Sequence, residues 1–147
     1  MSDINIQTLG YFLFRSLTSM IRLLNYELSQ SGFEIQYPQF AILMILSKKE
    51  GLSQSEIKDI VDRDKASVSR NLNYLVEKGY VKRRAYDGKT KLIYLTEKGK
   101  DTIPYLYRIA RKNQEISLQG FSEEEKKKII EGLRKIYLNI SQVTDNL

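Results

Sequence analysis

The sequence contains no cysteine and no histidine among its 147 residues. The absence of cysteine excludes disulfide scaffolds, thiolate catalysis and iron–sulfur clusters. The absence of histidine removes the usual residue of zinc sites, serine–histidine catalysis and pH switches near neutrality. Long apolar runs are missing too, because the longest extends only from Phe40 to Leu46, far short of the ~20 residues that span a bilayer.

The sequence also shows neither a secretory signal pattern nor a glycine-rich phosphate loop. The acidic run Glu123–Glu125 follows Ser122, so a helix cap explains it better than a metal site does. We therefore expect a cytoplasmic protein that uses no cofactor and is not an enzyme.

The net charge of +6 is concentrated in the middle of the chain. The segment 48–100 contains 14 lysines and arginines against 8 acidic residues, whereas the remainder contains 10 of each kind. A charge run is usually a solvated surface, but a basic surplus between neutral flanks indicates an anionic partner. Nucleic acid is the first candidate, and a membrane surface is the second.

Apolar spacing and capping residues predict a mainly α fold. The predicted helices cover 5–31, 37–50, two short stretches after Ser53 and Asp64, 97–118, and a last stretch from 123. Ser53 with Glu56, and Ser122 with Glu125, form capping boxes. We expect Ile57, Ile60 and Val61 to face inward, and Pro104 to kink its helix.

The two short helices are separated only by Asp62 and Arg63, which is typical of a helix-turn-helix. Strand-like runs follow over 81–86 and 90–95, and Asp87–Gly88 between them predicts a hairpin. A helix-turn-helix followed by a hairpin is a winged helix. We therefore predict a DNA-binding winged helix-turn-helix over 36–96, flanked by helical dimerisation regions over 1–35 and 97–147.

The last predicted helix has an apolar seam of heptad type. Its residues are Ile129, Leu133, Ile136, Ile140 and Val143. The flanking helices could fold back on the middle of their own chain as core helices, or they could interlock with a second copy. A two-fold dimer would place two recognition helices ~34 Å apart, which matches an inverted-repeat site in double-stranded DNA.

Four segments in this order resemble the MarR family of bacterial winged-helix regulators: Tyr37–Leu43, Lys65–Arg70, Leu75–Val81 and Leu92–Gly99. The resemblance covers essentially the whole chain. It implies a homodimeric transcription regulator, which we expect to be a repressor relieved by a small amphipathic or phenolic effector. The wing departs from the family, whose tip usually reads Asp-Arg-Arg, because this chain has Asp87–Gly88–Lys89. Arginine suits a narrow minor groove better than lysine, so entry of this wing into the groove stays open.

The helix after Asp64 is the predicted DNA reader. Val68, Leu72 and Leu75 recur at helical spacing and face the core. The opposite side carries the predicted contacts to phosphates and bases, which are Lys65, Ser67, Ser69, Arg70, Asn73 and, obliquely, Tyr74. A merely solvated helix surface is the alternative, although such surfaces favour Glu–Lys pairs over this run of small polar residues.

The hairpin is the second predicted DNA contact, through Arg84, Lys89 and Lys91. A two-residue turn would pair Tyr86 with Lys89 and Arg84 with Lys91, and would place the basic side chains on one face. Opposed like charges destabilise a hairpin, and a polyanion would remove that penalty. A longer turn would change this arrangement. A basic edge that blocks strand pairing is the alternative role.

The sequence does not assign an effector site. Eight aromatic residues could line one, and they are equally suited to a core or a dimer interface: Tyr11, Phe14, Tyr26, Phe33, Tyr37, Phe40, Tyr105 and Tyr107. Besides a DNA-binding regulator, a winged-helix module that docks protein or RNA without specific DNA binding stays open. The membrane hypothesis is weaker, because the basic residues lie on a hairpin and a polar helix surface instead of a basic amphipathic helix.

Overall fold

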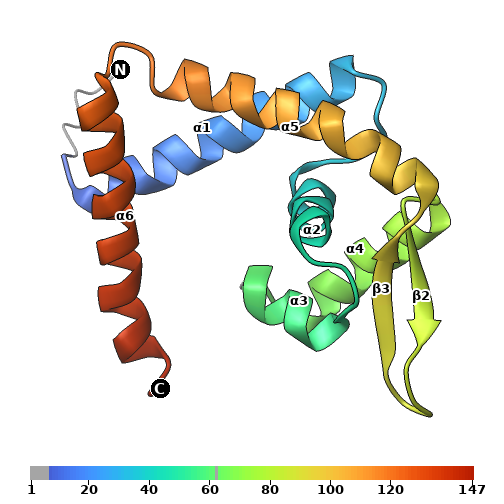
Figure 1. The fold of residues 1–147 in the computed structure, drawn as a ribbon. Helices are drawn as coiled ribbons and strands as arrows, with labels where there is room; N and C mark the ends of the chain where they lie inside the picture. The colour runs from blue at the N-terminus through green and yellow to red at the C-terminus, as the bar shows by residue number, and fades with distance from the viewer. Residues whose placement is uncertain (1–6, 62) are drawn as a thin grey trace, which may run out of the picture. The chain divides into compact units, whose positions relative to one another are not determined.

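The computed structural model describes residues 7–61 and 63–147, which form the predicted mainly α winged helix-turn-helix (Figure 1). The elements are α1 Leu9–Gln30, α2 Tyr37–Lys48, β1 Leu52–Ser53, α3 Gln54–Val61, α4 Lys65–Glu77, β2 Val81–Ala85, β3 Lys91–Leu95, α5 Glu97–Ser117 and α6 Glu123–Thr144. The Thr8 hydroxyl caps α1 by accepting from the Tyr11 amide. Residues 5 and 6 of the first predicted helix, and Asp62 of the predicted turn, lie outside the described residues.

Local capping fixes the helix starts as predicted. The Asp64 carboxylate accepts from the Ser67 amide at 2.8 Å at the start of α4. Ser53 and Glu56 form a reciprocal box, in which the Glu56 carboxylate accepts from the Ser53 amide at 2.8 Å. The box between Ser122 and Glu125 begins α6 in the same way. Each box satisfies amides that the first helical turn leaves unpaired.

One hydrophobic core joins the helix-turn-helix, the sheet, α1 and α5. Its most buried side chains include Leu28, Leu43, Ile57, Leu72, Ile93 and Leu106. Ile57 and the half-buried Val61 face this core as predicted, but the prediction for Ile60 is wrong, since that side chain is 56% exposed. At 100° per residue, Val61 returns close to the face of Ile57, whereas Ile60 lies on the other flank of the helix.

The start of α5 lies against the turn between α4 and β2. The Thr96 amide donates to the Tyr80 carbonyl at 3.1 Å, and the Thr96 hydroxyl accepts from the Gly99 amide at 3.1 Å. Gly99 is so close to this carbonyl that an added Cβ would lie 2.1 Å from the oxygen. α5 remains helical through Pro104 to Ser117, so the proline does not end it, and the kink stays a prediction.

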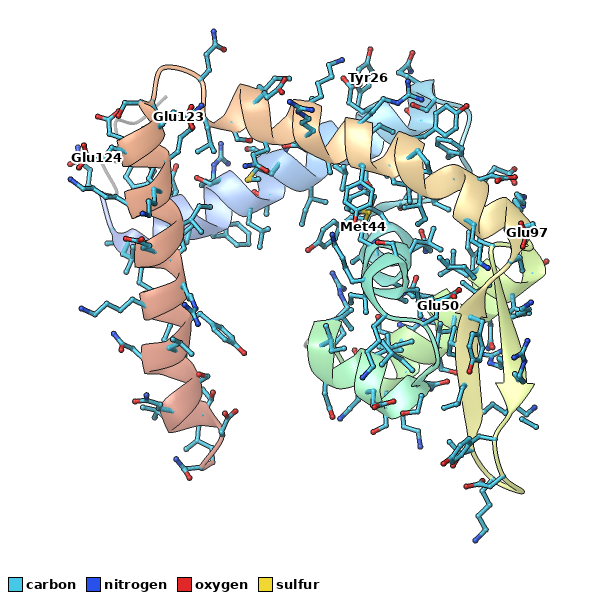
Figure 2. The ribbon with its side chains drawn as sticks, in the orientation of Figure 1. Tyr26, Met44, Glu50, Glu97, Glu123 and Glu124 are labelled. Carbon is cyan, nitrogen blue, oxygen red and sulfur yellow. The ribbon has the colours of Figure 1, made fainter. Side chains whose placement is uncertain are left out.

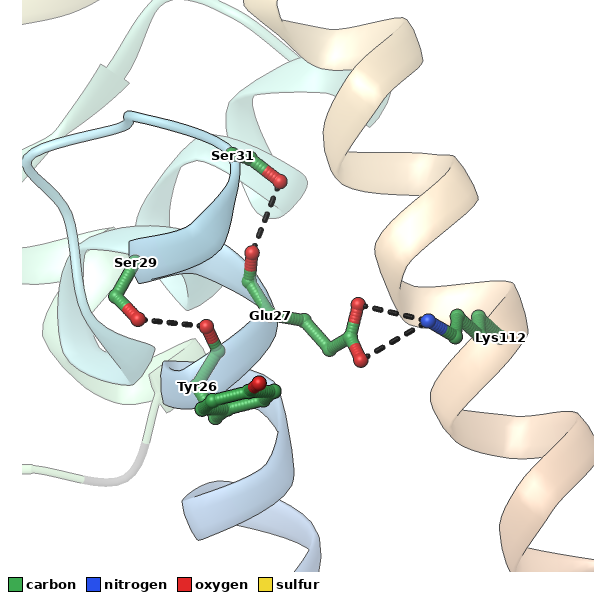
Figure 3. Close-up of polar contacts among 5 residues, drawn as sticks. All are labelled: Tyr26, Glu27, Ser29, Ser31 and Lys112. Atoms are coloured by element: carbon green, nitrogen blue, oxygen red, sulfur yellow. Dashed lines mark hydrogen bonds and ion pairs between the residues drawn. The ribbon is translucent and has the colours of Figure 1, made fainter.

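Polar contacts attach α1 to α5 further along (Figure 3). The Lys112 ammonium lies 3.0 Å from both carboxylate oxygens of Glu27. One position on, the Asn113 side chain donates to the Met20 carbonyl at 2.9 Å, and Asn113 is buried. These contacts complement the apolar packing of Leu24 and Leu28 in the core.

The sheet has three antiparallel strands in the order β1-β3-β2. Glu50, which follows α2, accepts from the Leu95 amide at 2.7 Å and so attaches the end of α2 to β3 (Figure 2). In the register, Val81 lies opposite Leu95 and Ala85 lies opposite Lys91. This register corrects the prediction of a two-residue turn, because Tyr86 pairs with Thr90 and leaves residues 87–89 in the loop.

A side chain in the loop accounts for the extra residue. The Asp87 carboxylate accepts from the Lys89 amide at 2.8 Å and from the Thr90 amide at 2.7 Å. An Asx turn of this kind replaces the backbone pairing that a tight two-residue turn would make. Gly88 does not adopt the positive φ that a tight two-residue turn uses.

The chain forms two compact units, residues 1–113 and 114–147. The first unit includes the winged helix together with α1 and most of α5, so the unit boundary differs from the predicted divisions after residues 35 and 96. In the second unit, α6 buries none of its own side chains. None of the helices in the described part of the chain is long and apolar enough to cross a membrane.

Candidate nucleic-acid interface

The core side of α4 determines which side chains it presents to solvent. Val68, Leu72 and Leu75 are buried. The predicted reader residues Lys65, Arg70 and Asn73 are exposed, and Ser67 and Ser69 are half-buried beside them. Because all of these residues belong to the first unit, their mutual positions are set by one core. The exposed side is therefore polar, and its short serine side chains allow a groove edge to approach the helix closely.

The N-terminus of α4 is closed by its own cap. The Ser67 amide already donates to Asp64, and this backbone hydrogen bond lowers the pKa of the Asp64 carboxyl below its usual range. Asp64 is therefore ionised at neutral pH and places a negative charge where a phosphate would meet the helix end. A phosphate at this end thus depends on the Lys65 ammonium more than on the Ser67 amide.

Ser67 also belongs to a polar connection between α2 and α4. The Asn71 side chain donates to the Ser67 carbonyl at 2.9 Å, and its own oxygen accepts from the Gln39 side chain at 2.7 Å. Gln39 and Asn71 were not among the predicted residues. Asn71 follows Val68 by three positions, which places it towards the core side of the helix. This helical spacing is the sequence pattern from which a contact of Asn71 within the fold could have been predicted.

Tyr74 differs from the other predicted reader residues. Its side chain packs against the core, and its hydroxyl donates to the Glu34 carbonyl in the loop between α1 and α2. The Lys78 ammonium lies 5.7 Å from the centre of its ring. The proton that the Tyr74 hydroxyl would donate to a phosphate is therefore already used within the fold, and the DNA contact of Tyr74 stays a prediction.

The observed register separates the basic residues of the wing. Arg84 shares a face with Tyr94, and its guanidinium lies 4.8 Å from the centre of that ring. Lys91 is on the other face, opposite Ala85, and Lys89 lies in the loop. The predicted single basic face is therefore wrong, because the longer turn shifts the pairing by one residue. Arg84, Lys89 and Lys91 are all exposed nevertheless.

Arg83 is a residue of this surface that the sequence analysis did not select. Its guanidinium donates to the Asn73 side-chain oxygen at 2.8 Å, which connects β2 to α4. The alternation along the hairpin indicated Arg84, whereas Arg83 has the opposite orientation. A contact between a strand and a helix ten residues apart depends on tertiary packing, which no local spacing reveals.

Known proteins resemble the chain in sequence and in fold. Residues 33–89 match a protein-family model described as MarR family. The uncharacterized HTH-type transcriptional regulator YybA of Bacillus subtilis is 27% identical over 106 residues, which cover 71% of each chain. The crystal structure of a MarR transcriptional regulator from Methanosarcina mazei Go1 is 27% identical, with a TM-score of 0.83 over 91% of this chain and 90% of that chain.

A structure solved with DNA shares the same fold. It is a mutant MarR from E. coli complexed with operator DNA, which is 24% identical and has a TM-score of 0.78 over 87% of this chain and 92% of that chain. At that level of identity, the likeness concerns the fold alone.

Proposed function

Because the chain belongs to the MarR family of transcriptional regulators and has its DNA-binding helix-turn-helix, we propose that it is a homodimeric repressor that acts in the cytoplasm. It recognises an inverted-repeat site in double-stranded DNA and releases that site when a small-molecule effector binds. The family assignment also confirms the prediction that the chain regulates transcription and is not an enzyme.

The observation that carries the DNA proposal is the one-sided exposure of α4 beside a basic wing. Arg70 lies opposite the buried Leu72 side of α4, where it can read a base edge in the major groove. Lys65 at the start of the helix and Lys89 and Lys91 on the wing supply charges for phosphates. The short side chains of Ser67 and Ser69, between Lys65 and Arg70, allow the helix to approach DNA closely.

Exposed apolar side chains support the dimer proposal. Along α6, Leu133 is 42% exposed, Ile140 is 56% exposed and Val143 is 62% exposed. On α1, Phe12 and Phe14 are 54% and 65% exposed. Apolar surfaces of this extent mark association sites in proteins that stay in solution. A second copy of the chain would cover them and would supply the two-fold symmetry of an inverted-repeat site.

A cleft in the first unit supports the effector proposal. It has a volume of about 1140 Å³ and is lined by residues of the α1–α2 loop, of α5 and of the turn after α4. Of the aromatic residues predicted from sequence, Phe33 and Tyr105 line it, with their ring centres 5.9 Å apart, while Tyr37 and Phe40 pack against the core. Aromatic walls with nearby Lys98 and Arg108 suit a small amphipathic anion or phenol.

The position of the cleft suggests how an effector would act. Tyr80, at the turn between α4 and the wing, lines it together with Lys98 and Thr102 of α5. A ligand that contacts both sides favours whichever arrangement of α5 and the winged helix fits it best. If the effector binds more tightly to an arrangement that does not fit DNA, the protein shifts towards that arrangement and its affinity for DNA falls.

Selection of bound sequences from random duplexes, followed by gel shifts with competitor DNA, tests the proposal. We expect enrichment of an inverted repeat and saturable binding that survives competitor. Adding phenolic compounds should release the enriched duplex. Binding that competitor removes completely would instead favour a winged-helix module that docks protein.

A further inference from the structure

Arg83 and Asn73 form a polar pair at the junction between the recognition helix and the wing. The Arg83 guanidinium donates to the Asn73 side-chain oxygen at 2.8 Å. Asn73 is exposed on α4, and Arg83 is half-buried on the face of β2 that it shares with Val81. The pair is therefore accessible from the side on which α4 and the hairpin meet.

The pair presents hydrogen-bond donors to a partner. A guanidinium has five N–H groups, and one of the Arg83 groups is used on Asn73. Within residues 7–61 and 63–147, Arg83 forms no ion pair with a carboxylate, so its charge is available. The Asn73 amide keeps both N–H donors, while its oxygen already accepts from Arg83.

This arrangement disfavours adenine. An asparagine that reads adenine accepts from the N6 amino group through its oxygen and donates to N7. The Asn73 oxygen retains a second lone pair, but an amino group placed there would meet the N–H groups and the positive charge of Arg83. Acceptor atoms, such as phosphate oxygens or O6 and N7 of guanine, meet favourable charge and donors from both side chains.

The position of the pair favours phosphate over a base. If α4 enters the major groove as proposed above, the sugar–phosphate strand at the edge of that groove passes below the junction between α4 and β2. We propose that Arg83 and Asn73 act as one donor-only unit that binds an acceptor oxygen of the DNA, a phosphate of this strand, and that Asn73 does not read adenine. This inference rests on the DNA binding proposed above and assigns the chemistry of one of its contacts.

Three variants test the inference. Arg83→Met removes the charge of the unit, and Asn73→Ala removes its amide. Arg134→Met is the matched control, because it removes the same charge from an exposed residue of α6, outside the helix-turn-helix and the wing. Each variant is compared with the unchanged protein by selection from random duplexes and by the salt dependence of binding. Circular dichroism melting checks folding, and Asn73→Ala changes only an exposed side chain.

We expect Arg83→Met to weaken binding to every duplex by about tenfold and to reduce the log–log salt slope by about 0.9. Asn73→Ala should weaken binding without changing the base preference. The double variant should bind like Arg83→Met alone, because coupled residues are not additive. If Arg83→Met instead abolishes one guanine preference and leaves the slope unchanged, the acceptor is a guanine, and the assignment of the pair to a phosphate is overturned.

An adenine preference that Asn73→Ala abolishes would overturn the inference, and so would variants that bind like the unchanged protein. Neither result would affect the proposed function, provided that the unchanged protein binds saturably in competitor. Loss of that binding in the unchanged protein would contradict the proposed function itself.

Discussion

Glu34, in the loop between α1 and α2, lies 2.9 Å from the ammonium of Lys78 at the C-terminal end of α4. The Tyr74 hydroxyl donates to the carbonyl of the same glutamate. Together these contacts attach the loop to the end of the recognition helix. Since Glu34 also lines the cleft, an effector bound there would touch residues that hold α4 in place.

The first prediction concerns the pH dependence of this ion pair. The hydrogen bond and charge of Lys78 lower the pKa of Glu34, and Glu34 raises the pKa of Lys78. The contribution of Glu34 to stability is therefore present above the ordinary glutamate pKa and is lost as pH falls through the lowered value. The contribution of Lys78 is complete below the ordinary lysine pKa and is lost as pH rises through the raised value.

Glu34→Gln should therefore lower the melting temperature slightly at neutral pH, and the difference should close in acid. Melting curves from acidic to neutral pH measure it. Glu131→Gln on α6 is the control, because it removes an exposed carboxylate that is not part of this ion pair. An equal difference for Glu34→Gln at all pH values would mean that the ion pair does not stabilise the fold.

The second prediction concerns close backbone packing at α5. Gly99→Ala places a Cβ 2.1 Å from the Tyr80 carbonyl oxygen, and backbone cannot give way as a flexible side chain can. We expect a loss of about 1–3 kcal/mol in the free energy of unfolding, measured by urea denaturation. Gly10→Ala is the control, since nothing lies within 4 Å of its added Cβ. Unchanged stability in Gly99→Ala would show that α5 does not press against the turn.

The third prediction concerns base reading by the recognition helix. Arg70→Ala should reduce affinity for the selected site by about 1–3 kcal/mol, because a bidentate contact to a base edge is lost. Affinity for random DNA should change less, which titrations of both duplexes will measure. An equal loss on the two duplexes would reassign Arg70 to phosphate.

The fourth prediction concerns the wing lysines, which act as point charges on phosphates. Lys89→Gln and Lys91→Gln should each reduce the log–log salt slope by about 0.9, and by about 1.8 together. Sequence preference should persist, because α4 is unchanged. The separate variants are informative because Lys89 lies in the loop and Lys91 lies on the strand. A slope equal to that of the parent protein in one variant would remove that lysine from the interface.

The fifth prediction concerns the oligomeric state. Ile140→Glu places a charge in the α6 seam, where the isoleucine is 56% exposed in the single chain. Sedimentation at micromolar concentration should show a dimer for the unchanged protein and a monomer of 17.2 kDa for the variant. Gln142→Glu adds the same charge on the other side of α6 and should leave the dimer intact. A monomeric parent protein would remove the argument for an inverted repeat.

Features that depend on neighbours in the sequence were predictable. Ser53, Asp64 and Ser122 cap helices because a hydroxyl or carboxylate can reach an amide three residues on. The buried side of α4 followed in the same way from the spacing of Val68, Leu72 and Leu75. These elements were enough to predict the winged helix and the exposed polar side of α4.

Features that depend on tertiary contacts were not predictable. The Tyr74 hydroxyl finds a carbonyl 40 residues away in the chain, and Arg83 meets Asn73 only when β2 packs beside α4. The prediction of the wing turn was wrong for a more local reason. The Asp87 carboxylate competes with the backbone for two loop amides and so lengthens the turn. Sequence patterns do not show which of two such hydrogen-bonding schemes is more stable.

The Asp87 turn has a consequence for the tip of the wing. Its hydrogen bonds join Asp87 to the amides of residues 89 and 90 and use no side chain of residue 88 or 89. Gly88 has an ordinary φ, and nothing lies within 4 Å of an added Cβ. The tip can therefore change its side chains at residues 88 and 89 while the loop keeps its shape. An arginine at residue 88 or 89 would therefore leave these hydrogen bonds in place, and under the proposed function it would change how the wing contacts DNA.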